Sequence, residues 1–296
     1  MVATSSPEAT EAGLRMLRRG GTAADAAIAA AAMLCVAEPM CTGLGGDVFA
    51  LVEADGAIFG LDAAGPAPRV ADPSAPVERS GPRSVTVPGA ASGWSLLSQR
   101  FGRLGLEESL AAAIDAAERG CVVHEKAASM WGDIGSCPPE LLPAPPAGGI
   151  VRMPALALTL RAVASRGPEA IYEGPIASAI CAVSWLEEDD LASYRGSWVA
   201  PLRTGYRGSE VIEMPPPTQG IVALEALALL ESMEPTLSNV VRCVQLALED
   251  GVANVRDGAD VRHLLAPGFL DQRRNADAHP VEPVAAGTIY LSAMDE

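Results

Sequence analysis

The chain has 296 residues, of which 49% are hydrophobic and 20% are charged, a composition typical of a folded protein with a sizeable core. Its formal net charge of −16 argues against a nucleic-acid or anionic-membrane surface, because both need a cationic patch. The longest apolar run, Ala26–Ala37, is shorter than the roughly 20 residues that span a bilayer, and no signal-peptide cleavage site follows it. We therefore expect a cytoplasmic protein with neither a membrane nor a nucleic-acid partner.

The first third of the chain carries clear helix and strand signals. Ser6 caps a helix that ends at Gly20-Gly21, and Thr22 with Asp25 forms a capping box before a buried apolar helix over Ala23–Ala37. A glycine-rich turn at 42–46 then leads into two strands, Asp47–Glu53 and Ala57–Leu61, which are joined at Asp55-Gly56. The Pro- and Ser-rich stretch 63–88 is predicted to be a long loop.

Further elements follow at helical and strand spacing, so that helices and strands alternate along the chain as in an α/β or layered α+β fold. Additional helices are predicted over Ala90–Arg100, Glu107–Arg119, Pro154–Ser165, Gly220–Ser232 and Ser238–Val255, and strands over Tyr206–Glu213 and Thr288–Met294. The acidic run Glu187–Asp190 predicts a solvated loop or a helix start. No linker is long or polar enough to divide the chain into domains.

Cysteine and histidine spacing gives no metal motif. No two cysteines stand at CxxC spacing, and no histidine stands beside a cysteine or a second histidine at ligand spacing, so a zinc site is not expected. Scattered cysteines in a chain of this size are typical of buried free thiols. The six are Cys35, Cys41, Cys121, Cys137, Cys181 and Cys243.

The glycine-rich turn Gly43-Leu44-Gly45-Gly46 allows two interpretations. It lies between a helix and a strand, whereas a dinucleotide site needs a strand before the glycines and a helix after them. It is therefore either a tight turn in which two backbone segments approach closely, or one wall of an active-site pocket.

Several stretches resemble the γ-glutamyltransferase (glutathione hydrolase) family of N-terminal nucleophile hydrolases. With gaps, the resemblance runs from Met1 to Asp295. Its motifs are Glu11–Leu14, Gly20–Ala27, Glu38-Pro39, Gly43–Asp47 with Phe49, Val87–Ala90 with Gly93-Trp94, Gly167–Gly174, Asp190–Tyr194 and Met214–Gly220. The resemblance implies an α+β fold, a four-layer αββα sandwich. It also implies an amidohydrolase or acyltransferase that needs no metal or organic cofactor and acts on a small amide or peptide-like substrate.

The resemblance also implies a nucleophile at Thr288. Members of the family cleave their own precursor before a threonine, which then begins the small subunit. Thr288 stands at that place, directly after Gly287, while Ile289 and Tyr290 replace the Thr-His that the family has next. A hydroxyl is a weak nucleophile, and the freed α-amine, with a reference pKa of about 7.7–8.0, can serve as its base. Otherwise Thr288 is an ordinary strand residue.

One departure concerns substrate recognition. The arginine that binds the α-carboxylate of the γ-glutamyl group would fall on Ala64 or Pro66, and neither side chain can make a bidentate carboxylate contact. Arg69 is close in sequence but lies outside the motif, and it is either a substrate-binding residue or a solvated loop arginine. The departure favours a non-standard substrate, either another amide or an activated C–C bond in a specialised biosynthetic pathway.

A second departure concerns length. Residues 1–287 correspond to a large subunit, and 288–296 correspond only to the start of a small one. Either the sequence is a fragment, or a small-subunit-like polypeptide completes the fold, or the protein is an inactive large-subunit-like scaffold. If the sequence is part of a longer natural product, that product should split between Gly287 and Thr288.

Overall fold

The computed structural model describes residues 1–295 except 73, 77, 79, 132–140 and 282–287. The chain forms two compact units, each assembled from segments that are discontinuous in sequence. Unit 1 contains Met1–Val48, Ala63–Gly196 and the described residues after 287, and unit 2 contains Phe49–Asp62 and the described part of Ser197–Ala285. At 48/49, 62/63 and 196/197 the chain passes between the units within or beside strands, where no linker marks the boundary. The division into a large-subunit-like region, 1–287, and the start of a small one, 288–296, stays a prediction.

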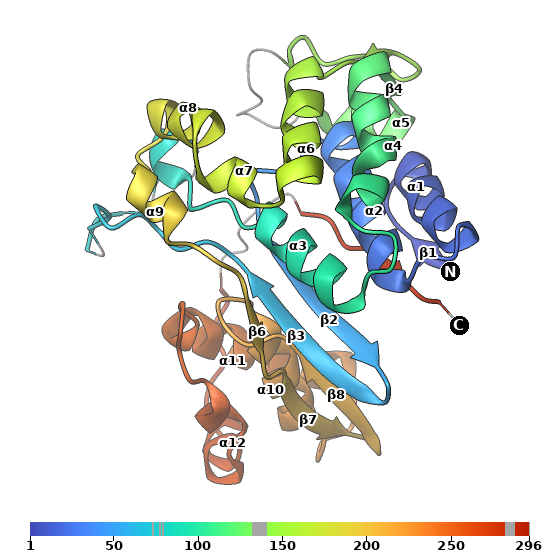
Figure 1. The fold of residues 1–296 in the computed structure, drawn as a ribbon. Coiled ribbons are helices and arrows are strands. Elements are labelled where there is room, and N and C mark those ends of the chain that lie inside the picture. The colour runs from blue at the N-terminus through green and yellow to red at the C-terminus, as the bar shows by residue number, and fades with distance from the viewer. Residues whose placement is uncertain (73, 77, 79, 132–140, 282–287, 296) are drawn as a thin grey trace. The chain divides into compact units, whose positions relative to one another are not determined.

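Unit 1 is mainly helical (Figure 1). Its helices are α1 (Pro7–Arg18), α2 (Ala23–Ala37), α3 (Ala90–Phe101), α4 (Leu106–Arg119), α5 (Glu125–Trp131), α6 (Pro154–Arg166), α7 (Glu169–Tyr172), α8 (Pro175–Val183) and α9 (Glu188–Ala192), with a 3₁₀ turn at Pro82–Ser84. Two short antiparallel ladders join β1 (Val2–Ala3) to β9 (Ser292–Ala293) and β4 (Cys121–Val122) to β5 (Ile150–Val151).

Unit 2 combines two small sheets with helices. Strands β2 (Val48–Ala54), β3 (Ala57–Ala63) and β6 (Ser197–Val199) form one sheet in that order, with β3 antiparallel to β6. Strands β7 (Leu202–Tyr206) and β8 (Ser209–Glu213) form an antiparallel hairpin. The helices are α10 (Gly220–Leu230), α11 (Leu237–Asn254), the 3₁₀ segment Arg262–Leu265 and α12 (Pro267–Arg273).

Helix α2 forms the centre of unit 1. It packs against α1, α3 and α4, and most of its side chains are buried, as expected for a helix that is apolar all round. The predicted capping box is present, and the buried Asp25 carboxylate also accepts hydrogen bonds from the backbone N–H groups of Arg103 and Leu104. One carboxylate therefore fixes the start of α2 to the segment that follows α3. Among the described helices, none is both long and apolar enough to cross a bilayer.

Most predicted helices lie within a few residues of their predicted bounds, but the strand predicted over Tyr206–Glu213 was wrong. Those residues end β7, turn and form β8. The turn residues Arg207 and Gly208 have φ of 50° and 81°, the left-handed pair of a tight hairpin turn. The predicted Asp55-Gly56 turn uses the same geometry, with φ of 53° and 73°. Because arginine rarely occupies this conformation, no turn could be predicted from the residue type at 207.

The acidic run at 187–190 begins helix α9, one of the two predicted alternatives. Its last residue is not solvated, however. Asp190 is only 6% exposed, and its carboxylate accepts a hydrogen bond from the Glu187 N–H at 3.0 Å. The run is thus a capping box at the helix start rather than a purely surface charge cluster.

A polar cluster lies inside unit 2. The Arg273 guanidinium contacts Glu249 and Asp250 of α11 at 2.5 Å each, and Glu225 of α10 is fully buried beside them. The hydrogen bond from Arg273 lowers the pKa of Glu249. Burial, with the neighbouring Asp250 carboxylate, raises the pKa of Glu225 to about 9, although Arg273 acts in the opposite direction. Glu225 is therefore protonated at neutral pH.

Candidate functional site

Residues 288–294 form an extended segment that lies against unit 1. Burial alternates strictly along it, with Ile289, Leu291 and Ala293 packed on the core of α1 and α2, and Thr288 and Tyr290 exposed. Only Ser292–Ala293 makes ladder hydrogen bonds, so the strand predicted over Thr288–Met294 is shorter than expected. The period of two nevertheless directs the Thr288 side chain away from the core.

The far end of this segment is anchored at two points. The Met294 N–H donates to the Met1 carbonyl at 2.8 Å, next to the Val2–Ala293 pair of the β1–β9 ladder. The Asp295 carboxylate accepts a hydrogen bond from the Ala23 N–H at 2.7 Å. Ala23 is the first residue of α2, where the helix dipole favours negative charge. Together with the apolar contacts of Ile289, these anchors fix the position of Thr288.

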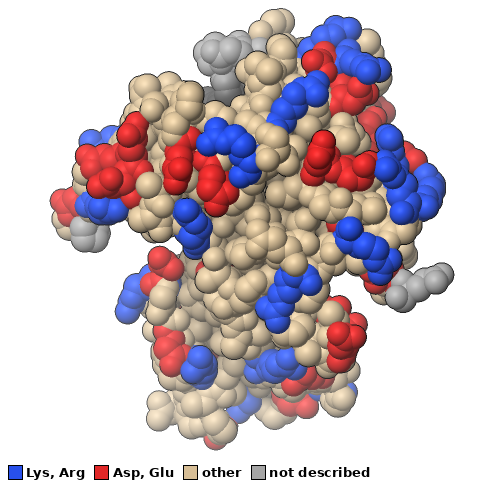
Figure 2. All heavy atoms as spheres, in the orientation of Figure 1, with Lys and Arg blue, Asp and Glu red and all other residues tan. Residues whose placement is uncertain are grey.

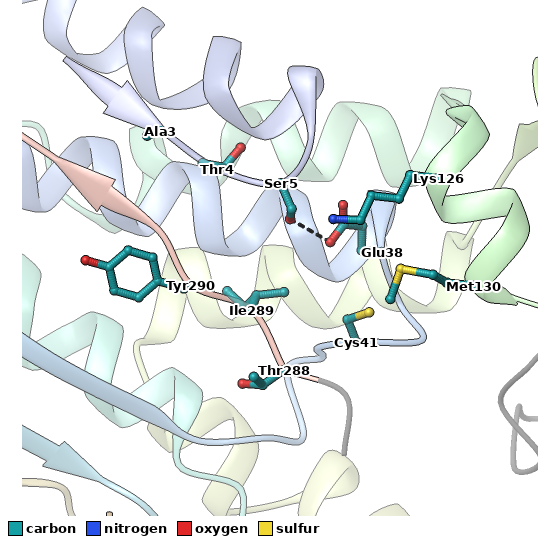
Figure 3. A pocket seen from close by; sticks show the side chains of 10 residues that line it. All are labelled: Ala3, Thr4, Ser5, Glu38, Cys41, Lys126, Met130, Thr288, Ile289 and Tyr290. Atoms are coloured by element: carbon teal, nitrogen blue, oxygen red, sulfur yellow. Dashed lines mark hydrogen bonds between the residues drawn. The ribbon is translucent and has the colours of Figure 1, made fainter. Parts of the chain in front are cut away.

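Thr288 borders a cavity of about 400 Å³ (Figure 3). The cavity lies between the end of β1, the segment after α2, helix α5 and the start of the 288–294 segment. Its lining residues are Ala3, Thr4, Ser5, Glu38, Cys41, Lys126, Met130, Thr288, Ile289 and Tyr290. All belong to unit 1. Of the site residues predicted from the sequence, Thr288 lines this cavity. Gly287, which precedes Thr288 at the predicted cleavage site, is outside the described residues.

A buried carboxyl group organises one wall of the cavity. Glu38 is 4% exposed and accepts hydrogen bonds from Ser5 Oγ at 2.7 Å and from His124 Nε2 at 3.2 Å. The opposite nitrogen of His124, Nδ1, accepts the Ala127 N–H at 3.2 Å, which places the ring hydrogen of neutral His124 on Nε2. Glu38 therefore connects the end of β1 to the start of α5 through one side chain.

Cys41 provides a thiol in the same cavity. Burial raises its pKa, and the negative charge of Glu38 adds to the effect, while the positive charge of Lys126 opposes it. The thiol is thus protonated at neutral pH and is a poor nucleophile. In the sequence, Glu38 is recognisable only as part of a family motif and Cys41 only as a free thiol. The one feature that distinguishes Lys126 is that it is the single lysine of the sequence.

Arg69, the candidate substrate-binding residue, does not line this cavity. Its guanidinium donates to the Asp189 carbonyl at 2.9 Å and to Ser193 Oγ at 3.3 Å, and lies 3.6 Å from the Asp190 carboxylate. Figure 2 shows acidic and basic side chains gathered together over the α8–α9 region, where this contact occurs. Arg69 is thus engaged with α9, and its role in substrate binding stays a prediction.

The glycine-rich turn serves as a backbone contact point. The Gly46 carbonyl accepts hydrogen bonds from the N–H groups of Gly89 and Ala90 at 2.9 Å each. A Cβ on Gly89 would lie 1.8 Å from the Ala63 carbonyl oxygen, so only glycine fits there. This is the first of the two interpretations, close approach of backbone segments, and residues 43–46 are not among those lining the Thr288 cavity.

The cysteines follow the expected pattern where they are described. Cys35, Cys121 and Cys243 are buried free thiols, and Cys41 and Cys181 are partly buried free thiols. Cys137 lies outside the described residues.

Comparisons with known proteins extend over nearly the whole chain. The γ-glutamyltranspeptidase family model matches residues 9–295. The chain is 32% identical to the Acylase ACY 1 proenzyme of Pseudomonas sp. (strain V22), and the match covers 93% of this chain and 57% of that protein. It is also 32% identical to the glutathione hydrolase-like YwrD proenzyme of Bacillus subtilis (strain 168), and that match covers 80% of this chain and 49% of the relative. It thus spans about half the length of these relatives.

A solved structure shows the same fold. The crystal structure of cephalosporin acylase from Bacillus halodurans matches with a TM-score of 0.86 and 35% identity, covering 99% of this chain and 63% of that one. This likeness confirms the α+β fold of the N-terminal nucleophile hydrolase type that the motifs implied. The family model, the two relatives and the solved structure agree with one another, and the chain belongs to the γ-glutamyltranspeptidase family.

Proposed function

We propose that the protein is a γ-glutamyltransferase-like amidohydrolase or acyltransferase with Thr288 as its nucleophile. The observation that carries this proposal is the placement of Thr288. Its side chain is on the outward face of an anchored extended segment and borders a cavity large enough for a small acyl group. A hydroxyl held in this way can meet a carbonyl carbon without a large rearrangement of the chain.

The proposed reaction has two steps. Thr288 Oγ attacks the amide carbonyl, its proton passes to the freed α-amine of Thr288, and then to the departing amine as the C–N bond breaks. The acyl group, now an ester on Oγ, is transferred to water or to an acceptor amine, and the hydroxyl is regenerated. Formation of the α-amine requires cleavage of the bond between Gly287 and Thr288, after which a small-subunit-like polypeptide begins at Thr288.

The substrate is proposed to be an amide other than an ordinary γ-glutamyl compound. Ala64 and Pro66 occupy the places of the family arginine, and Arg69 is engaged with α9. Two of the similar proteins described above carry the name acylase, which supports the same direction. Poor turnover of γ-glutamyl anilides, together with turnover of other acyl amides, would be the expected pattern.

The test compares three variants expressed from the full reading frame. Thr288→Ala should abolish turnover of a panel of acyl amides, whereas Thr288→Ser, which keeps a hydroxyl beside the amine, should retain part of it. Ser292→Ala is the matched control, because it removes a hydroxyl from the same exposed face of the segment without touching the proposed nucleophile. Equal activity of Thr288→Ala and the unaltered protein, at equal melting temperature, would refute the proposal.

A further inference from the structure

Lys126 is the only lysine in the sequence, against twenty arginines among the 21 basic residues. It is exposed, and it is the second residue of α5. The N-terminal turn of a helix disfavours a positive charge. Helix stability therefore does not explain why a cation stands at this position, and a local conflict of this kind often marks a functional site.

Glu38 is the carboxyl group among the residues that line the cavity. Both oxygens of Glu38 already accept hydrogen bonds, one from Ser5 and one from His124. Within the described part of the chain, no ion pair to the Lys126 ammonium occurs. The charge is therefore available to a ligand.

The charge also acts inside the cavity. Lys126 and Met130 extend from one face of α5 toward Glu38 and Cys41 (Figure 3). The positive charge of Lys126 partly offsets the rise that burial causes in the pKa of the Cys41 thiol. Met130 and Ile289 give the same cavity apolar surface, and Thr288 lies at its border. The site thus presents an ammonium group, apolar walls and a hydroxyl to one small ligand.

We propose that Lys126 is a specificity-determining residue that binds a carboxylate of the substrate in the Thr288 cavity. The preferred substrates are then amides that combine a short apolar chain with a carboxylate. A lysine ammonium holds that carboxylate as a point charge, without the fixed two-point geometry of an arginine. This inference rests on the proposed function for the reaction itself, but the binding of an anionic ligand can be measured separately.

The first experiment measures binding by titration calorimetry at low salt, with succinate and its uncharged analogue succinamide as probes. The protein should bind succinate more tightly than succinamide, and Lys126→Gln should weaken succinate binding about tenfold while leaving succinamide unchanged. Arg166→Gln, the same charge change on an exposed residue that does not line the cavity, is the matched control and should have no effect. Equal succinate affinity in the protein and in Lys126→Gln, or no succinate binding at all, would overturn the inference.

The sole lysine allows a second readout without any variant. Succinate, but not succinamide, should protect Lys126 from acylation by an amine-selective reagent, as read by peptide mass spectrometry. Unprotected labelling at saturating succinate would also overturn the inference.

Kinetics then separate this inference from the proposed function. Lys126→Gln should lower kcat/KM for succinyl-4-nitroanilide about tenfold and leave butyryl-4-nitroanilide unchanged. If Lys126 binds succinate but no amide is turned over, the inference stands and the proposed function fails. If both anilides are turned over and Lys126→Gln changes neither, the proposed function stands and the inference fails.

Discussion

The Thr288 cavity in unit 1 and the polar cluster in unit 2 both combine a cation with buried carboxyl groups, but they do so differently. In unit 2, Arg273 is 16% exposed and is bound by two carboxylates, so its charge is satisfied within the fold. In unit 1, the Glu38 carboxyl group has its own two donors, and Lys126 stands beside it without an ion pair to a described residue. A cation that is neutralised within the protein, such as Arg273, stabilises the fold, whereas an exposed cation at a cavity, such as Lys126, can bind a ligand.

The largest effect is expected from removing the satisfied cation. Arg273→Ala would leave Glu249 and Asp250 without their shared partner next to the buried Glu225, and should destabilise unit 2 by about 3–5 kcal/mol. Urea denaturation followed by hydrogen exchange of α10 and α11 would measure the loss. Arg262→Ala is the control, because its pair with Asp260 is exposed and should contribute no more than about 1 kcal/mol. Similar losses in both variants would contradict this description of the cluster.

The next effect depends on pH. The folded pKa of Glu225, about 9, is above its ordinary value of 4.5, so the folded state binds more protons than the unfolded state between these limits and stability must fall as pH rises through this window. The cost should reach roughly 3 kcal/mol at pH 7.

Glu225→Gln cannot ionise and should remove this dependence. Its free energy of unfolding should match that of the unaltered protein near pH 5 and exceed it increasingly up to pH 9. A constant difference across this range would show that Glu225 does not keep its proton in the folded protein.

A smaller effect is expected at Glu38. Glu38→Gln keeps the shape but replaces one acceptor by a donor, so either Ser5 or His124 loses a well-matched partner, at about 1–2 kcal/mol. Combining it with Ser5→Ala in a double-mutant cycle isolates their coupling. Strictly additive melting-temperature changes would argue against Glu38 as the residue that organises this wall.

The smallest effect on stability is expected at Lys126. Lys126→Gln removes a charge that has no ion pair among the described residues and that the start of α5 disfavours, so the free energy of unfolding should change by no more than about 0.5 kcal/mol. Thermal unfolding measures this directly. A loss of more than about 2 kcal/mol would mean that Lys126 stabilises the fold, as Arg273 does.

The sequence predicted local structure better than it predicted the site. Helix α2 could be recognised because its capping box and apolar run act locally. The hairpin at Arg207 was missed because arginine does not signal the left-handed conformation that aspartate signals at the equivalent place of the Asp55-Gly56 turn. No linker composition marks the two units, because their boundaries at 48/49, 62/63 and 196/197 fall in or beside strands.

At the site, Thr288 was predicted through family motifs, since no local pattern marks a lone threonine as a nucleophile. The Glu38–His124 hydrogen bond joins residues 86 positions apart in sequence, so no spacing rule could predict it. The single lysine was visible in the composition, but its nearness to Thr288 depends on how α5 packs against the segment after α2.

Trapping of the acyl-enzyme shows directly whether Thr288 carries the acyl group. The protein, expressed from its full reading frame, is mixed with a reactive acyl donor, quenched in acid within a turnover, digested and mapped by mass spectrometry. If Thr288 is the nucleophile, a fragment that begins Thr-Ile-Tyr should carry the mass of one acyl group on Thr288. An adduct on Cys41, or turnover with Thr288 unmodified throughout, would contradict it.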